Sequence, residues 1–97
     1  MTAEADPHLH SARRVEPLSG GCPECLQLGL TWIHLRICLS CGHVGCCDSS
    51  PGRHATAHFH TTGHPIIESF EPDEDWGWCY VHGEFIDLPE ELRVAKR

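Results

Sequence analysis

Two pairs of cysteines carry the clearest chemistry in this sequence, because each pair has the C-x2-C spacing of a zinc knuckle. The pairs are Cys22/Cys25 and Cys38/Cys41. Two thiolates at this spacing can reach one tetrahedral zinc ion, at about 2.3 Å, from a single tight turn. Further soft or borderline ligands follow the second pair, at Cys46, His54, His58 and His64. Together these residues predict a protein that binds two Zn²⁺ ions.

The number of cysteines favours metal binding over disulfide chemistry. The chain has 97 residues with 7 Cys and 9 His, and an odd cysteine count leaves one thiol over in a pure disulfide framework. Residues 1–6 have neither the basic flank nor the apolar stretch of a secretion signal, so we expect a cytoplasmic protein with reduced thiols. A redox C-x2-C site is disfavoured because no βαβ pattern surrounds either pair.

Composition disfavours several classes of function. Lys and Arg number 7 against 14 Asp and Glu, and a formal charge of −7 opposes binding to a phosphate backbone, so we expect no nucleic-acid partner. No apolar run approaches the ~20 residues of a membrane-spanning helix, so we expect no membrane insertion. A chain this short buries only about 60% of its unfolded surface. We therefore expect a single, monomeric domain whose fold depends on bound metal ions.

Strands are predicted where polar and apolar side chains alternate. This pattern covers residues 31–38 and again residues 76–81. Residues 42–46 are short enough to pair beside the first of these strands, and residues 65–70 are extended. The acidic stretch 71–75 predicts a solvated turn between two strands.

A helix with recognisable start and stop signals lies among these strands. Ser50 is suited to the N-cap, Pro51 to the first helical position, and Gly63 to a left-handed end. Residues 89–95 predict a last, short helix, whereas residues 1–20 are polar and read as an extended arm. Strands with helices placed apart from them indicate an α+β domain.

Spacing alone leaves open how the ligands divide between two zinc ions. One quartet matches the spacing of a DNA-binding C2H2 finger: Cys38, Cys41, His54 and His58. Pro51 and Gly52 interrupt the helix that such a finger has begun before its first His, and the net charge is negative. A sequential division would give the four knuckle cysteines to one ion. An interleaved division would separate His54 from His58, although i,i+4 side chains lie on one helix face.

Several longer motifs resemble the UBP-type zinc finger family. They include the run Cys38-Leu-Ser-Cys-Gly-His-Val-Gly-Cys-Cys-Asp-Ser-Ser50, Arg53-His-Ala-Thr-Ala-His58, Thr62-Gly-His-Pro65, Ser69-Phe-Glu-Pro72 and Trp78-Cys-Tyr80. The family is best known as the ubiquitin-binding finger of ubiquitin-specific proteases and of a cytoplasmic histone deacetylase. This variant is similar to small stand-alone bacterial members. The resemblance implies a small twisted antiparallel sheet with two short helices, held by interleaved zinc sites.

The resemblance also implies a division of the ligands. The first zinc would be held by Cys22, Cys25, Cys46 and His54. The second would be held by Cys38, Cys41, His58 and His64. In this pattern His54 sits at or before the helix start, which answers the objection from helical spacing. The family's step after the preceding Cys selects Cys46 rather than its neighbour Cys47, which we expect to be a packed free thiol.

A third zinc site is allowed by the same resemblance. The deacetylase-type finger has an N-terminal C-x-H and a late C-x2-C, and the corresponding residues here are Asp6, His8, Cys79 and His82. Asp and His both bind zinc, although the set is harder than the cysteines it replaces. His10 is an alternative to Asp6. Otherwise Cys79 would be a buried free thiol and the arm would be disordered.

Aromatic residues match the peptide pocket of the ubiquitin-binding relatives. Trp78, Tyr80 and Phe85 fall at its wall positions. In those relatives an Arg shortly after the third zinc-ligand Cys grips the carboxylate of the ubiquitin C-terminus, but here that position is Asp48. An anion there repels a carboxylate. We therefore expect a protein or peptide partner, without tight binding to the ubiquitin C-terminus.

Two other functions remain open beside this one. The chain could be a true binder of a ubiquitin-like C-terminus, or a purely structural, zinc-stabilised adaptor. The adaptor interpretation predicts that the C-terminal segment covers Trp76 and Trp78, through Leu88, Leu92 and Val94. Catalysis is not expected, because both assigned zinc sites are closed by four protein ligands and no H-E-x-x-H motif occurs. The predicted division is an arm at 1–19, the finger at 20–87 and a short helix or tail at 88–97.

Overall fold

A computed structural model describes residues 6–95 of the chain. Their two α-helices are α1 (Pro23–Leu28) and α2 (His54–Thr62). The five strands are β1 (Leu35–Cys38), β2 (Val44–Cys46), β3 (Ile66–Ser69), β4 (Gly77–Cys79) and β5 (Glu84–Ile86). Two short 3-10 helices, η1 (Pro7–Ser11) and η2 (Glu90–Leu92), lie near the ends. The expected α+β fold, an antiparallel sheet with two short helices, is confirmed.

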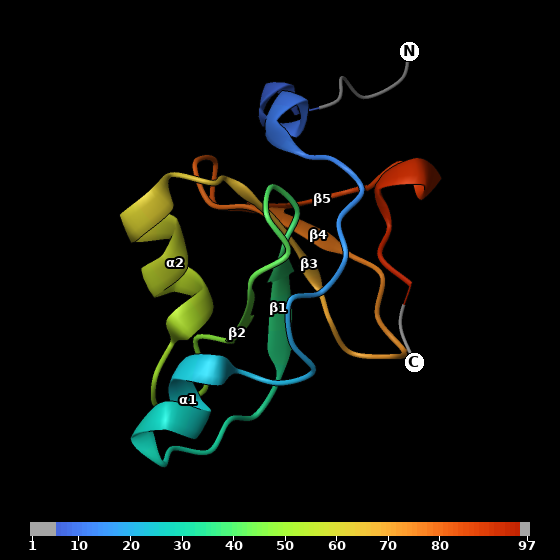
Figure 1. The fold of residues 1–97 in the computed structure, drawn as a ribbon. Coiled ribbons are helices and arrows are strands. Elements are labelled where there is room, and N and C mark those ends of the chain that lie inside the picture. Colours follow the sequence, from blue (N-terminus) through green and yellow to red (C-terminus); the bar gives the residue numbers. More distant parts are fainter. Residues whose placement is uncertain (1–5, 96–97) are drawn as a thin grey trace.

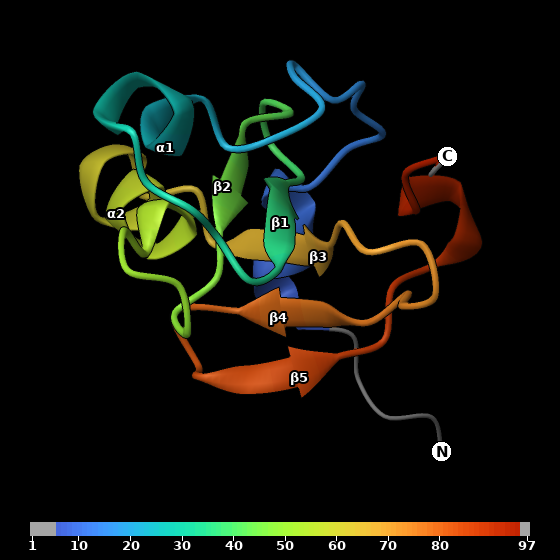
Figure 2. The same cartoon turned by 90° about the horizontal axis from the view of Figure 1, so that it is seen from below.

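The strands form one antiparallel sheet in the order β2-β1-β3-β4-β5. In the register, Ile37 lies opposite Val44 on one side and opposite Glu68 on the other, and Trp78 lies opposite both Ile67 and Phe85. Both helices lie together beside the β2 side of the sheet, and the C-terminal segment lies on the far side from them (Figures 1 and 2). The two helices therefore pack on one side of the sheet, and the C-terminal segment packs on the other.

The core is small and contains cysteines beside ordinary apolar residues. Ile37, Leu39, Val44 and Ile66 are fully buried. Four cysteines of the same cluster are equally inaccessible: Cys22, Cys25, Cys46 and Cys79. A cysteine behaves as a small hydrophobe and supplies less apolar area than Leu or Ile. Apolar burial alone is thus modest, as the composition predicted.

Helix α2 begins later than the sequence signals indicated. The prediction placed Ser50 at its N-cap, but the N-cap residue is Arg53, whose backbone is left-handed with φ of 47°. Ser50 is buried and its hydroxyl oxygen accepts a hydrogen bond from the backbone N–H of Ile33 at 2.8 Å, so it is not available to cap the helix. His54 therefore becomes the first helical residue.

Both ends of the chain also differ from their predicted conformations. The arm is not simply extended, because Asp6 caps η1 by accepting a hydrogen bond from the backbone N–H of His8 at 2.8 Å. Val15, farther along the arm, is buried in the core. The predicted last helix is reduced to the three residues of η2, and Val94 is held beyond it by a 2.9 Å hydrogen bond from its N–H to the buried Glu68 carboxylate. Strand β5 was not predicted, because residues 84–86 lie outside the stretches in which polar and apolar side chains alternate.

Candidate metal centres and binding pocket

The first group of candidate ligands is assembled from α1, β2 and the start of α2. It contains Cys22, Cys25, Cys46 and His54. His54 Nδ1 lies 3.3 Å from the Cys22 sulfur and 3.4 Å from the sulfurs of Cys25 and Cys46, and the Cys25 and Cys46 sulfurs are 3.7 Å apart. A tetrahedron with zinc–sulfur bonds of about 2.3 Å has edges of about 3.8 Å. These separations fit a four-coordinate zinc.

Burial makes this group dependent on a cation. Burial, together with the neighbouring Cys22 and Cys46, raises the pKa of the Cys25 thiol to about 12. Thiolates would be costly there without positive charge, and zinc binds thiolates rather than thiols. A bound Zn²⁺ would supply that charge and displace the protons.

The second group lies at the other end of α2. It contains Cys38, Cys41, His58 and His64. The Cys38 sulfur is 3.5 Å from His64 Nδ1, and the Cys41 sulfur is 3.3 Å from His58 Nε2. These distances also fit the edges of a zinc tetrahedron. The ligand atoms of each group lie within 4.8 Å of one another, so the structure brings residues together in the interleaved division and not in the sequential one.

The separation of His54 from His58 has a geometric explanation. His54 is the first residue of α2 and uses Nδ1, whereas His58 lies one turn further and uses Nε2. Nδ1 is close to the backbone and Nε2 is at the far side of the ring. The two imidazoles therefore reach different groups, although their positions lie on one face.

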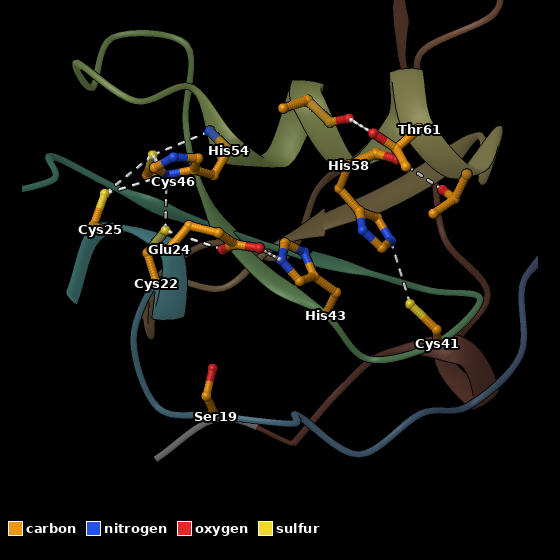
Figure 3. Close-up of polar contacts among 12 residues, drawn as sticks. Ser19, Cys22, Glu24, Cys25, Cys41, His43, Cys46, His54, His58 and Thr61 are labelled. Atoms are coloured by element: carbon orange, nitrogen blue, oxygen red, sulfur yellow. Dashed lines mark hydrogen bonds and ion pairs between the residues drawn. The ribbon is translucent and has the colours of Figure 1, made fainter. Parts of the chain in front are cut away.

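A hydrogen-bonded pair lies between these two groups (Figure 3). Glu24, within the first knuckle, has Oε2 2.8 Å from Nε2 of His43. The His43 ring stacks on His58, with ring centroids 4.1 Å apart and planes 7° from parallel. Burial raises the pKa of Glu24, but the hydrogen bond with His43, a backbone hydrogen bond and the nearby imidazoles together leave the pKa below its ordinary value. Glu24 and His43 thus connect the two groups.

A third group joins the N-terminal arm to β4. It contains Asp6, His8, Cys79 and His82, and the structure places Asp6 rather than His10 in it. The Cys79 sulfur is 3.5 Å from His8 Nδ1 and 3.8 Å from His82 Nδ1. The Asp6 carboxylate lies 2.9 Å from His8 Nδ1 and 2.7 Å from His82 Nδ1. These last distances are hydrogen bonds, shorter than the edge of about 3.3 Å expected between oxygen and nitrogen ligands of one zinc.

Electrostatics at this third group follow those hydrogen bonds. Burial raises the pKa of the Asp6 carboxyl, but hydrogen bonds with His82, His8 and Cys79 hold it well below its usual range. The hydrogen bond with Asp6 raises the pKa of His82 in turn. The side chains can therefore hold the arm through ionic hydrogen bonds.

A pocket of about 360 Å³ lies over the sheet, between the loop after β2 and strands β4 and β5. The four residues that sequence analysis assigned to a pocket all line it: Asp48, Trp78, Tyr80 and Phe85. Trp76 lines it as well. Leu88 packs against Gly77 of β4, where a side-chain carbon added to the glycine would lie 2.8 Å from Leu88. Leu88, Leu92 and Val94 are absent from the lining, so this segment leaves the pocket open.

Arg36 of β1 is a pocket residue that sequence reasoning missed. Its guanidinium carbon lies 4.5 Å from the centre of the Trp76 ring. Nη1 donates to the Leu35 carbonyl at 3.0 Å and lies 4.0 Å from a Glu74 carboxylate oxygen. The alternation in residues 31–38 already placed Arg36 on the polar face, but nothing in the sequence indicated that this face lines the pocket.

Tyr80 closes the pocket on the side of α2. Its ring stacks on Phe59 with centroids 4.7 Å apart, and its hydroxyl lies 3.3 Å from the Thr56 hydroxyl. The Thr56 hydroxyl donates to Asp48 at 2.6 Å. Burial, reinforced by the Asp48 charge, raises the pKa of Tyr80 to about 12.

Comparison with known proteins identifies the family. The model of a family described as the Zn-finger in ubiquitin-hydrolases and other proteins matches residues 22–91. The chain belongs to this family. A Rhodopseudomonas palustris protein with a solution NMR structure is 54% identical in sequence to this zinc finger, and the two structures superpose with a TM-score of 0.83. That match covers 94% of this chain and 89% of the other. A search of the curated proteins gives no match.

Membership of this family confirms the UBP-type zinc finger resemblance and agrees with Zn²⁺ as the cofactor. The family consists of zinc-finger modules rather than catalytic domains. Within residues 6–95, no helix has the length and apolar character needed to cross a bilayer.

Proposed function

We propose that this UBP-type zinc finger binds a peptide segment of a partner protein in the pocket between β4, β5 and the loop after β2. The open pocket supports this function, because four aromatic side chains line a concave surface over the sheet. Aromatic walls with a few polar groups are typical of ligand sites. We further propose that the protein is cytoplasmic, monomeric and non-catalytic.

Zinc would act structurally in this function. The first two groups would each hold one Zn²⁺ with the ligand sets described above, which are closed by four side chains. The ions would join α1 and α2 to strands β1 and β2, and so position the loop that carries Asp48. A third ion among Asp6, His8, Cys79 and His82 remains a prediction, since those side chains already satisfy one another by hydrogen bonds. We also retain, as part of this proposal, the division into an arm at 1–19, a finger at 20–87 and a tail at 88–97.

The ubiquitin C-terminus is a poor ligand in this proposal. Asp48 contributes a negative charge to the pocket where a carboxylate would enter. Titration of ¹⁵N-labelled protein with a Leu-Arg-Gly-Gly peptide bearing a free carboxylate tests this. We expect the Trp78 indole and Tyr80 amide to shift no more with this peptide than with its C-terminal amide, because Asp48 disfavours the carboxylate. Micromolar binding with shifts at those residues that is lost on amidation would instead establish a C-terminus binder.

A structural adaptor is the second candidate, and an exposed apolar surface supports it. Leu26, Leu28 and Ile33 are 67%, 65% and 56% exposed. They lie in and after α1, and none of them lines the pocket. A Leu26→Ser, Leu28→Ser variant distinguishes the two functions, because it should weaken an adaptor contact and leave peptide binding at the pocket unchanged.

A further inference from the structure

We propose that the pocket selects a basic side chain, an arginine or lysine of the partner segment, with Asp48 as its counter-ion and the aromatic rings as its walls. This inference rests on the proposed function and names the chemistry of its ligand.

The aromatic residues of β4 and β5 form a surface suited to a cation. The Phe85 ring meets Trp76 and Trp78 edge to face, with centroid separations of 5.1 Å and 4.9 Å. Phe85 remains 66% exposed in spite of these contacts. Aromatic faces carry negative electrostatic potential and attract a guanidinium or ammonium group. The same walls accept the methylene stem of Arg or Lys.

Asp48 supplies an oriented negative charge to the pocket. The side chain is exposed, and its Oδ1 is fixed by the 2.6 Å hydrogen bond from Thr56. Within residues 6–95, Asp48 has no ion-pair partner. A carboxylate held in one position beside aromatic faces favours an incoming cation by charge and by geometry.

Arg36 is a cation in the pocket lining and opposes this assignment, but its contacts within the chain answer the objection. Its guanidinium lies over Trp76, donates to the Leu35 carbonyl and is close to Glu74. Glu74 is held there by a 2.6 Å hydrogen bond from the Ser69 hydroxyl. That hydrogen bond lowers the pKa of Glu74, burial raises it by less, and the charge of Arg36 lowers it further. The pKa therefore lies below its ordinary value and the carboxylate stays ionised. Arg36 is thus balanced by Glu74, whereas Asp48 is left for the ligand.

The net charge of the chain supports the same ligand class. A formal charge of −7 attracts basic segments and repels acidic ones at long range. A free carboxylate would have to approach this field and displace Glu74 from Arg36. The observations therefore favour the basic side chain over a peptide C-terminus.

The test uses the zinc-loaded full chain and three short probes. The first is acetyl-Gly-Arg-Gly-amide, which has a cation and no free carboxylate. The second replaces Arg by citrulline, which keeps the shape and removes the charge. The third is Gly-Gly-Gly with a free carboxylate and a capped amine. Binding is followed by the indole signals of Trp76 and Trp78, with Trp32 outside the pocket lining as an internal reference.

We expect saturable shifts from the arginine peptide, weaker binding in high salt, and no comparable shift from the other two probes. Asp48→Asn should weaken binding of the arginine peptide on the order of tenfold. Asp73→Asn is the matched control, because it removes the same charge from an exposed residue outside the pocket lining and should leave binding within about twofold.

Three outcomes would overturn the inference. Equal binding of the citrulline peptide, or equal losses in the Asp48 and Asp73 variants, would remove charge recognition at Asp48. Preference for the free-carboxylate probe would replace the cation by an anion. Each of these leaves the peptide-binding proposal intact, whereas absence of pocket shifts with all three probes and with Leu-Arg-Gly-Gly would remove both.

Discussion

The first two Cys/His groups and the third group differ in how their side chains meet. The measured contacts among ligand atoms in the first two lie between 3.3 and 3.7 Å, as expected around a central ion. In the third, Asp6 touches two imidazoles at 2.7 and 2.9 Å. The first group is mostly buried and rich in sulfur, while His82 of the third is exposed. Thiols form only weak hydrogen bonds with one another, whereas a carboxylate with imidazoles can satisfy itself by hydrogen bonding.

The three groups also differ in what they hold together. The first two connect both helices to β1 and β2. The third connects the arm to β4, and the arm has further support from Val15 in the core and from a 2.8 Å hydrogen bond between Arg13 N–H and the Leu39 carbonyl. We therefore expect a graded response when the groups are disrupted one by one.

The largest effect is expected from removing the first group. Cys25→Ser, or strong chelator under reducing conditions, should unfold the domain, because a structural zinc contributes about 10–16 kcal/mol against a typical total stability of about 5–15 kcal/mol. Amide dispersion in NMR spectra measures the loss. Cys47→Ser is the control, since Cys47 belongs to none of the three groups. A chelated protein that keeps its dispersion and its Tm would contradict the structural role of zinc.

A smaller effect is expected at the third group. During a chelator titration followed by native mass spectrometry, any third ion should leave first, and the mass should pause at two zinc ions. His82→Ala should leave these two ions bound and the sheet folded, because the hydrogen bonds and ring contact of its side chain are with Asp6, His8 and Cys79 of the third group. Release of all metal in a single step would show that the groups are equivalent.

The Glu24–His43 pair should couple the first two groups. Glu24→Gln or His43→Ala should each destabilise the protein by roughly 1 kcal/mol, a value reduced from that of a buried charged pair because Glu24 is 42% exposed. A double-mutant cycle on denaturant unfolding measures the interaction. Additive single effects would mean that the pair does not act as a unit.

The smallest effect concerns Tyr80, the only tyrosine of the chain. Its pKa is about 12 in the folded protein against about 10 when unfolded, so its contribution to stability is complete below pH 10 and is lost as pH rises towards 12. Tyrosinate absorbance should therefore rise with a midpoint well above 10. Asp48→Asn should lower that midpoint by removing a nearby negative charge, and Asp73→Asn should not. A midpoint near 10 in folded protein would contradict the buried position of Tyr80.

Local spacing was enough to predict the metal chemistry. Cys22 and Cys25, like Cys38 and Cys41, are close enough in the chain that one turn brings each pair to a common ion. The same reasoning failed at α2, because Ser50 is a good N-cap by type yet hydrogen-bonds to Ile33 instead. A capping signal is local, but competition for its hydroxyl came from a residue 17 positions away.

The sequence by itself determined which residues could bind metal and that the fold would be α+β. Tertiary structure decided which ligands meet, because contacts such as Asp6 with His82 span 76 positions and depend on how the arm lies against β4. It also decided that Arg36 joins the aromatic residues of the pocket and that the C-terminal segment packs away from them. Spacing constrains neighbours within a turn, whereas sheet order and register bring distant segments together.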